Sequence, residues 1–227
     1  MRRIVVLGGG FAGLHAAQKL ERMLEGRRRV QLTVVDGADS FVFTPLLPNV
    51  ANGELTTSSI RLRLREQLRP KTRLEHAWVE GIDMARRELT SDAGSIPFDY
   101  LVLAPGAVTD WKGNASWAPH AMTCKTAADA HTIRAHMRRK VAQAKGRTGE
   151  EQRRALTFVF AGGGPTGVEL AAELWAALSY EVLPAASPEV RRALRFVIVE
   201  PAPVVLPGLP PELQVFARRR LDDLGIE

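Results

Sequence analysis

Cysteine is almost absent from this 227-residue sequence, which contains one, Cys124. A single cysteine cannot form an intramolecular disulfide, so a disulfide-stapled secreted scaffold is excluded. The paired-cysteine redox motif of disulfide reductases is excluded on the same ground. We therefore expect a cytoplasmic protein in which Cys124 is a buried or incidental residue and not a sulfide-oxidising thiol.

Long apolar runs are missing as well. No stretch approaches the roughly 18 residues that a membrane-spanning helix needs. The first residues, "MRRIVVLGGGFAGLHAA", begin with arginines and an apolar run, as a signal peptide does, but three glycines end that run after Leu7. We expect Ile4–Leu7 to be a buried strand instead, and any membrane contact of this chain to be peripheral.

Metal-ligand spacing and nucleic-acid-binding patterns are not found either. Two of the five histidines, His131 and His136, share a predicted helix but do not share a face of it well, so no metal site is expected. The 31 basic and 25 acidic residues give a net charge of +6. The arginine clusters are scattered and have no interleaved aromatic residues, which argues against nucleic acid as a partner. A solvated basic surface is favoured, and attraction to an anionic membrane or ligand is the alternative.

The sequence does contain two copies of one glycine-rich turn. "GGGFAG" occupies Gly8–Gly13 and "GGGPTG" occupies Gly162–Gly167. Each follows a short apolar strand, opens a helix of apolar periodicity and precedes a second strand, which is a βαβ unit. The first unit is predicted at Ile4–Leu7, Leu14–Leu24 and Gln31–Asp36, and the second at Leu156–Ala161, Val168–Tyr180 and Arg195–Glu200.

The G-x-G-x-x-G spacing suits a dinucleotide for physical reasons. The first glycine permits a tight turn, the second lets a pyrophosphate approach the backbone, and the third lets the helix pack on the strand. An acid about 20 residues later holds a ribose hydroxyl; Asp36 fits this spacing, whereas Glu200 stands farther from its turn because "LSYEVLPAASPEV" intervenes. No basic residue directly follows Glu200, so we expect NADH over NADPH. Two such sites suggest electron transfer between a nicotinamide and a flavin.

The other segments complete the predicted secondary structure. Expected are a loop over "SFVFTPLLPNVANGEL", a helix over Ile60–Leu68 capped by Thr57 or Ser58, and a hairpin turning at Asp92–Gly94. After the hairpin, a strand is expected in "YLVLAPGA", followed by a connector over residues 107–125 and a helix over Thr126–Lys145. An exposed loop is expected over "GRTGEEQRR", and a last helix over Pro211–Leu224. A further strand is expected to begin at "GIE", so we expect the chain to be a fragment.

These residues resemble the type II NADH:quinone dehydrogenases, within the larger group of flavoproteins that have two dinucleotide-binding domains. "VVLGGGFAGL" and "FVFAGGGPTGVELAAEL" fit many flavoprotein reductases, "FDYLVLAPGA" adds to them, and "FVFTPLLPNVANGEL" is much more specific. The resemblance implies an α/β fold: a Rossmann-like FAD-binding domain with an inserted, incomplete second Rossmann-like NAD-binding domain. The expected boundaries are 1–112 for the FAD-binding part, 113–155 for a connector and helix, and 156–227 for the NAD-binding part.

The resemblance also implies roles for individual residues. FAD would be held by Gly8, Gly10, Phe11, Ala12, Gly13 and Asp36, with Thr44, Pro45, Leu46, Ala104 and Gly106 near the flavin ring and the Val79 backbone at the adenine. NADH would be held by Gly162, Gly164, Pro165, Thr166, Gly167 and Glu200. Glu169 is the catalytic candidate, because a carboxylate beside the stacked rings would position the nicotinamide or influence proton delivery. Its alternative role is that of a first-turn glutamate that favours the helix dipole.

The implied reaction is hydride transfer from NADH to FAD and then transfer of two electrons to a quinone. The full-length protein would bind the cytoplasmic face of the inner membrane peripherally, and a homodimer is left open. The sequence departs from the family pattern at Ala104-Pro105-Gly106, where a threonine is usual, and the family's quinone-site and membrane-binding segments have no counterpart. A soluble NADH-dependent reductase of ferredoxin or a similar carrier, and a flavin-binding module that senses NADH, are the alternatives.

Overall fold

The computed structural model describes residues 1–144 and 146–227, which divide into two compact units. The first unit comprises Met1–Phe43 and Ser58–Thr109, and the second comprises Thr44–Thr57 and Asp110–Glu227. The short segment Thr44–Thr57 therefore packs with the second unit although the first unit flanks it on both sides in the sequence. The cofactor domains expected at 1–112 and 156–227 stay predictions, because packing alone defines these units.

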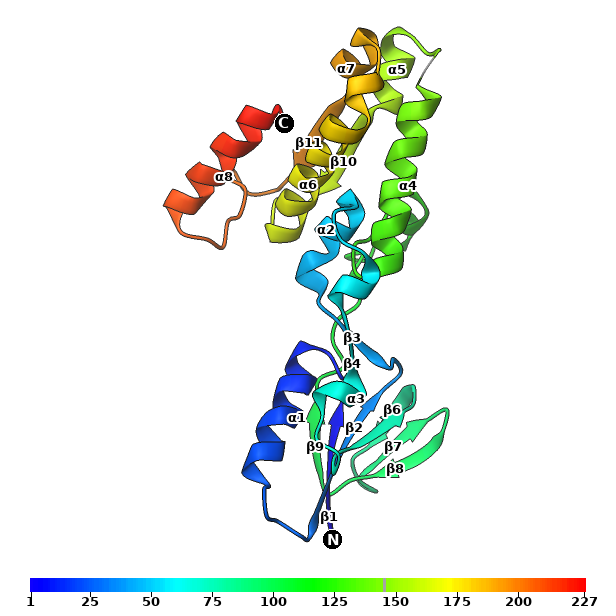
Figure 1. The fold of residues 1–227 in the computed structure, drawn as a ribbon, viewed down its shortest axis with the longest axis vertical. Coiled ribbons are helices and arrows are strands. Elements are labelled where there is room, and N and C mark those ends of the chain that lie inside the picture. The colour runs from blue at the N-terminus through cyan, green and yellow to red at the C-terminus, as the bar shows by residue number, and fades with distance from the viewer. Residues whose placement is uncertain (145) are drawn as a thin grey trace. The chain divides into compact units, whose positions relative to one another are not determined.

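A four-stranded parallel sheet forms the centre of the first unit, in the order β5-β2-β1-β9 (Figure 1). Its strands are β1 (Arg2–Leu7), β2 (Val30–Asp36), β5 (Arg73–His76) and β9 (Tyr100–Leu103), and helix α1 (Phe11–Met23) follows β1. The predicted first βαβ unit is thereby confirmed. All four carboxyl ends meet at one edge of the sheet, where open α/β sheets bind their ligands.

Two neighbouring residues of β1 anchor the core of this unit on opposite faces of the sheet. Val6 packs with α1 in a cluster that also contains Leu14, Ala17, Leu32, Val34, Phe41, Leu64 and Leu68. Val5 packs on the other face with Val35, Ala77, Leu89 and Phe98. Burial on both faces explains why the strands of a parallel sheet are almost continuously apolar. Each fully buried valine of this kind contributes about 1.5–3 kcal/mol.

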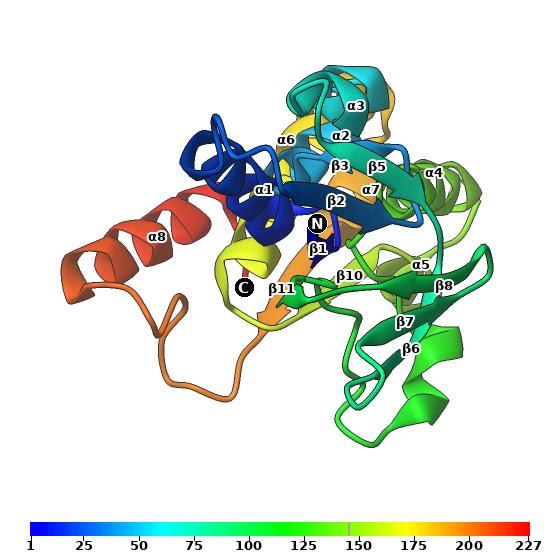
Figure 2. The same ribbon diagram turned by 90° about the horizontal axis from the view of Figure 1, so that it is seen from below.

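A small antiparallel sheet covers the Val5 face. It consists of β6 (Val79–Asp83), β7 (Glu88–Ser91) and β8 (Gly94–Pro97). Figure 2 shows these three strands beside the parallel sheet and not within it. The hairpin predicted at Asp92–Gly94 is confirmed, since Ser91 pairs with Gly94 across that turn.

The structure corrects the prediction of a loop at residues 40–55 and of a helix over Ile60–Leu68. Residues 40–55 contain β3 (Ser40–Val42), a 3-10 turn (Thr44–Leu46) and α2 (Leu47–Asn52). Residues 60–68 contain the end of a 3-10 turn (Thr57–Ile60), strand β4 (Arg61–Arg63) and only a short helix, α3 (Leu64–Gln67). Antiparallel pairing of β3 with β4 explains both errors, because a pairing between separated segments leaves no local periodicity.

The second unit repeats the βαβ arrangement. Strands β10 (Thr157–Ala161) and β11 (Arg195–Val199) are parallel, and α6 (Pro165–Glu181) connects them and packs on them (Figure 1). Fully buried Phe196 of β11 contacts the rings of Phe158, Phe160 and Trp175. The remaining helices are a 3-10 turn (Ala115–His120), α4 (Ala127–Gln143), α5 (Gly149–Ala155), a 3-10 turn (Leu183–Ala185), α7 (Pro188–Ala193) and α8 (Pro211–Leu224).

The last residue pairs as the expected next strand should. The amide of Glu227 donates to the carbonyl of Phe196 at 2.9 Å, and the amide of Ile198 donates to the carbonyl of Glu227 at 2.7 Å. These two bonds form one parallel bridge opposite Val197. The prediction that a strand begins at "GIE" is supported by this bridge, which places Glu227 beside β11.

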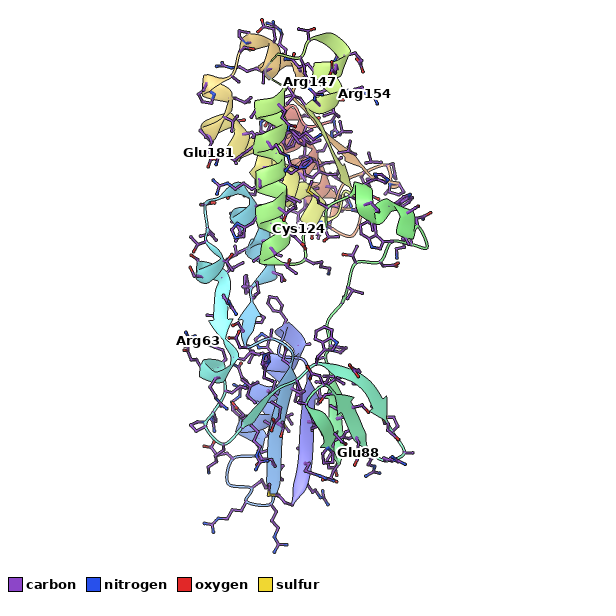
Figure 3. The ribbon with its side chains drawn as sticks, turned by 90° about the vertical axis from the view of Figure 1, so that its right-hand side faces the viewer. Arg63, Glu88, Cys124, Arg147, Arg154 and Glu181 are labelled. Atoms are coloured by element: carbon purple, nitrogen blue, oxygen red, sulfur yellow. The ribbon has the colours of Figure 1, made fainter. Side chains whose placement is uncertain are left out.

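Polar contacts tie α6 to both α2 and α4 within the second unit. The Asn52 amide, which is buried, donates to Oε2 of Glu173 on α6 at 2.6 Å. Arg134 and Arg138 of α4 form ion pairs with Glu181 of α6 at 3.1 and 3.4 Å, and Figure 3 labels Glu181. The sequence segment with the most specific family resemblance is thus fixed to the helix that follows the second glycine turn.

Three further expectations concern residues 107–154. The connector contains a 3-10 turn at Ala115–His120, and helix α4 starts after Thr126 as predicted, while the predicted end, Lys145, lies outside the described residues. The exposed loop expected over "GRTGEEQRR" is wrong, since α5 occupies most of it. Acidic residues in its first turn and arginines in its last turn suit the helix dipole, and Gln152 is buried against the carbonyl of Ala144.

Candidate functional site: two glycine turns, each closed by an acid

The first glycine turn connects β1 to α1. The Gly8 amide donates to the Val35 carbonyl at 2.8 Å, which fixes the start of the turn to β2. Gly8 has a left-handed φ of 100°, and a Cβ there would collide with the carbonyl oxygen of Ala104. A Cβ on Gly13 would collide with the carbonyl of Gly8, since α1 begins directly against the turn. Both positions therefore require glycine.

Gly10 lies between these crowded positions but faces open space. No atom lies within 4 Å of the point that its Cβ would occupy. Gly10 precedes α1 as its N-cap, and the first N–H groups of a helix have no partner within the helix. Together with the positive end of the helix dipole, they favour an anion at this point. The turn thus offers a diphosphate group close access to the backbone.

Asp36, at the end of β2, closes the turn. Its Oδ2 accepts a hydrogen bond from the Gly9 amide at 2.5 Å, and its Oδ1 accepts one from the Ala38 amide at 2.6 Å. A carboxylate has about four acceptor positions, so Asp36 can also accept a ribose hydroxyl while it holds the turn. A Cβ on Gly9 would lie 2.6 Å from a methyl group of Leu64, which explains the third consecutive glycine.

The second turn has the same construction. Gly162 has a φ of 108°, and its amide donates to the Val199 carbonyl at 2.8 Å. A Cβ on Gly167 would collide with the Gly162 carbonyl, whereas Gly164, the N-cap of α6, again has no atom within 4 Å of its Cβ position. Gly164 is therefore open as Gly10 is, and Gly167 is crowded as Gly13 is. Gly162 differs from Gly8, because no atom lies within 4 Å of its Cβ position.

Glu200 closes the second turn as Asp36 closes the first. Its Oε2 accepts from the Gly163 amide at 2.7 Å and its Oε1 from the Ala202 amide at 3.1 Å. The hydrogen bonds from Ala202 and Gly163 lower the pKa of Glu200 below its ordinary value of 4.5. Glu200 is consequently anionic at neutral pH, which suits a ribose diol and opposes a 2′-phosphate.

The residues present at both turns fit an adenine dinucleotide. Each turn combines an open glycine at a helix N-terminus with an ionisable acid at the end of the neighbouring strand, the two features that bind pyrophosphate and ribose. Gly8, Gly10, Gly13 and Asp36 are brought together as predicted, and so are Gly162, Gly164, Gly167 and Glu200. Pro165 and Thr166 form the exposed first residues of α6.

The other residues of the first unit that were predicted to bind FAD differ in their surroundings. The Ala104 amide donates to the Leu7 carbonyl at 2.8 Å, and Ala104 contacts both crowded glycines of the turn. Gly106 has a φ of 79° and open space at its Cβ position. The ring of Phe11, beside exposed Ala12, packs on Phe41 with a centroid distance of 4.8 Å. Val79 is half-buried in the core cluster under the small antiparallel sheet.

The remaining predicted residues lie in the second unit. Thr44, Pro45 and Leu46 form the 3-10 turn before α2, with Thr44 and Pro45 exposed. Glu169 is exposed on α6, immediately beyond the glycine turn. Their placement near a flavin ring stays a prediction.

One part of the second turn was missed in the sequence. The loop after Glu200 folds back, and the Leu206 amide donates to the Gly163 carbonyl at 2.7 Å. Leu206 adopts a left-handed φ of 55°, which is uncommon for leucine. Four prolines in "PAPVVLPGLP" were the available signal that this loop has a defined conformation.

Cys124, which precedes α4 and is labelled in Figure 3, has a thiol that does not ionise readily. Burial, together with the nearby charge of Asp129, raises the pKa of its thiol to about 11. In the described parts of the chain, no group of three or more histidine, cysteine, aspartate or glutamate residues is arranged to hold a metal ion. Among the same residues, no helix has the length and apolar character that crossing a bilayer requires.

Comparison with known proteins agrees with this geometry. The family model described as pyridine nucleotide-disulphide oxidoreductase matches residues 2–227. The chain is 34% identical over 234 residues to the type II NADH:quinone oxidoreductase NdhA of Mycobacterium tuberculosis, covering 99% of this chain and 48% of that protein. It is 29% identical over 218 residues to the mitochondrial external NADH-ubiquinone oxidoreductase 2 of Saccharomyces cerevisiae, covering 90% and 39%.

Among solved structures, NDH2 from Plasmodium falciparum in complex with NADH matches the whole chain with a TM-score of 0.85, at 23% identity and over 47% of that protein. This likeness confirms the predicted Rossmann-type α/β fold. The chain spans about half the length of the curated relatives that it matches.

Proposed function

The chain belongs to the pyridine nucleotide-disulphide oxidoreductase family, and from that premise we propose that its protein is an FAD-dependent NADH dehydrogenase that delivers electrons to a quinone. The observation that carries the proposal is the duplicated turn: Gly9 and Gly163 each donate an amide hydrogen bond to the acid at the end of the next strand. Two dinucleotide sites in one chain serve a reaction between two dinucleotides.

In this proposal the first turn binds FAD and the second binds NADH. Gly10 and Gly164 let the two pyrophosphates approach the backbone, and Asp36 and Glu200 accept ribose hydroxyl groups. When bound, FAD supplies the ring that accepts a hydride from NADH. The anionic state of Glu200 supports NADH as the reductant, because a 2′-phosphate beside it would bring two like charges together.

Glu169 is proposed as a residue beside the reacting rings. It is exposed on α6 just past the nucleotide turn, so its carboxylate is free to face a ligand. The polar contacts of α6 with α2 and α4 fix the helix that presents it. Its role would be to orient the nicotinamide amide group or to hold a proton near the acceptor, and not to act as a nucleophile.

The electron acceptor is proposed from the relatives. NdhA of M. tuberculosis is named as a quinone oxidoreductase and the S. cerevisiae relative as a ubiquinone oxidoreductase. Peripheral attachment to the cytoplasmic face of the inner membrane and a homodimer belong to the same proposal.

An absorption spectrum of the purified protein, recorded before and after anaerobic NADH, tests the proposal. We expect a flavin spectrum that NADH bleaches and that NADPH bleaches at least about tenfold more slowly. Turnover with a soluble quinone should follow. Flavin that NADH cannot reduce would contradict the dehydrogenase, whereas reduction without quinone turnover would favour a different acceptor.

A further inference from the structure

The exposed indole of Trp78 stands at the edge of the parallel sheet where the first glycine turn and Asp36 also lie. Its side chain is 68% exposed, which is unusual for so large an apolar group. It follows β5, the strand that pairs with β2 on the side away from β1. We propose that Trp78 is the aromatic surface on which the adenine of the first-turn dinucleotide stacks.

The order of the strands matches the order of groups in an adenine dinucleotide. The glycine turn follows β1, Asp36 ends β2, and His76 ends β5, so neighbouring sites along this edge are about 5 Å apart. If the pyrophosphate lies at the turn and the ribose at Asp36, the base attached to that ribose lies farther along the same edge, away from β1. That direction leads to the residues that follow β5, of which Trp78 has the large π surface.

The backbone holds Trp78 firmly in place. Its amide donates to Oδ1 of Asp92 at 2.8 Å, and its carbonyl accepts from the Asp92 amide at 3.1 Å. The preceding residue is also fixed, since the Ala77 amide donates to the Asp36 carbonyl at 3.1 Å. The backbone that carries the indole is thus already ordered, which lowers the entropy cost of ordering this segment when a ligand stacks on it.

Gly37 brings the indole next to the acid. A Cβ on Gly37 would lie 2.6 Å from Cε3 and 3.3 Å from Cζ3 of Trp78, so glycine lets the ring approach the backbone directly after Asp36. The backbone at Gly37 is not left-handed, so alanine would be tolerated there except for this ring. Glycine at this position therefore lets the ring lie against the backbone next to Asp36, and an alanine would push the ring away from it.

The inference rests on the proposed function, because it assigns the base of the FAD that the first turn would bind. Stacking of a base on an aromatic side chain typically contributes a factor of about 10 or more to affinity. The effect should be the same for FAD and for ADP, since both contain the adenine and only FAD contains the flavin ring.

Calorimetric titration of the flavin-stripped protein with FAD and with ADP tests the inference. We expect Trp78→Ala to weaken both ligands by about tenfold, Trp78→Phe to stay within about threefold of wild type, and Gly37→Ala to weaken both while the indole is retained. Trp117→Ala is the matched control, because Trp117 is 55% exposed and lies in the second unit. ADP should quench tryptophan emission in the wild type and in Trp117→Ala, but not in Trp78→Phe.

The outcomes separate this inference from the proposed function. Wild-type affinity of Trp78→Ala for FAD and ADP overturns the stacking role and leaves FAD binding intact. Weakened FAD with unchanged ADP, both titrated while NADH saturates the second turn, also overturns it, because the indole would then act elsewhere than at the adenine. A wild-type protein that binds neither ligand overturns the proposed function and this inference together. If Trp78→Ala fails to fold, unchanged quenching in Trp78→Phe still refutes the stacking.

Discussion

The backbone amide of Gly163 lies 2.7 Å from Oε2 of Glu200, so the acid at the end of β11 closes the turn at the start of α6. The same relationship joins Gly9 to Asp36 in the first unit at 2.5 Å. Each acid therefore holds its turn, and in the proposed function it would also face a ribose.

Replacing Glu200 with glutamine should reduce the preference for NADH over NADPH by at least about tenfold. Glutamine keeps one acceptor oxygen for the turn but removes the negative charge that opposes a 2′-phosphate. In the wild type the lowered pKa of Glu200 predicts a preference that is constant from about pH 7.5 to 9, where both Glu200 and the 2′-phosphate, whose second pKa is about 6, are ionised. Binding constants for both nucleotides over this range provide the measurement.

Glu212→Gln, in the first turn of α8, makes the same change of charge and is the control for that experiment. It should leave the nucleotide preference unchanged. An unchanged preference in Glu200→Gln would show that another feature of the second turn discriminates between the two nucleotides.

Alanine substitutions at Gly10 and Gly13 of the first turn should differ in their effects on stability and on FAD binding. Gly13→Ala should lower the free energy of unfolding by about 1–3 kcal/mol, because its Cβ would collide with the Gly8 carbonyl. Gly10→Ala should lower it by no more than about 1 kcal/mol, since that Cβ meets open space, yet it should weaken FAD at least about tenfold. Urea unfolding and FAD titration of both variants test this, and equal destabilisation would contradict it.

The βαβ units were predictable because their strands are buried on both faces and their turns have a fixed glycine spacing. The pairing of β3 with β4 was not, since Arg61–Arg63 is exposed and its partner strand is distant in the sequence. Helix α2 was not predicted because Pro48 favours a loop on sequence grounds. In the structure Pro48 lies in the first turn of α2, where a proline is tolerated.

The sequence predicted which glycines and acids come together at the two turns but not the hydrogen bonds between them. Spacing predicts a ribose role for Asp36, and the family resemblance implies one for Glu200. Their bonds to Gly9 and Gly163 depend on geometry that the sequence does not contain. The contact of Leu206 with the second turn was missed for the same reason, because it arises from a non-repetitive loop.

Removing the partner of Asn52 should destabilise the second unit. Glu173→Ala leaves the buried Asn52 amide without its 2.6 Å acceptor, which should cost about 1–3 kcal/mol. Glu173→Gln should restore most of this loss, because its carbonyl oxygen can accept the same hydrogen bond. Thermal unfolding measures both effects.

Glu181→Gln is the comparison for this pair of variants. It breaks more exposed ion pairs with Arg134 and Arg138 and should cost less than about 1 kcal/mol. Equal losses in Glu173→Ala and Glu173→Gln would show that the hydrogen bond to Asn52 is not what stabilises the contact between α2 and α6.

The thiol of Cys124 should be unreactive at neutral pH. A pKa of about 11, compared with an ordinary 9.0, predicts alkylation by iodoacetamide about a hundredfold slower than that of an exposed cysteine. Cys124→Ser should retain NADH-dependent bleaching of the flavin. Rapid labelling at pH 7.5, or loss of bleaching in Cys124→Ser, would contradict this and indicate that Cys124 takes part in the reaction.

The stability that the N-terminal cap of α4 contributes should depend on pH through Asp129. Its Oδ2 accepts hydrogen bonds from the amides of Lys125 and Thr126 at 2.9 and 3.0 Å, and its own amide donates to Oγ1 of Thr126 at 3.1 Å. Burial alone would raise the pKa of Asp129, but the hydrogen bonds that its carboxylate accepts from Lys125, Thr126 and Thr123 together outweigh burial and lower the pKa below 3.8. The charged form therefore favours the folded state.

It follows that the contribution of Asp129 to stability is fully present above its ordinary pKa of 3.8 and is lost as the pH falls through the lower folded value. Asp129→Asn should cost about 1 kcal/mol at pH 7, a cost typical of a helix cap, and should cost the same at pH 5. The difference from wild type should shrink only below about pH 4. Urea unfolding of both proteins at pH 7, 5 and 3.5 measures it, with Glu150→Gln on α5 as the control. A difference that grows as the pH falls from 7 to 5 would mean that the folded pKa of Asp129 is raised, and that the hydrogen bonds do not outweigh its burial.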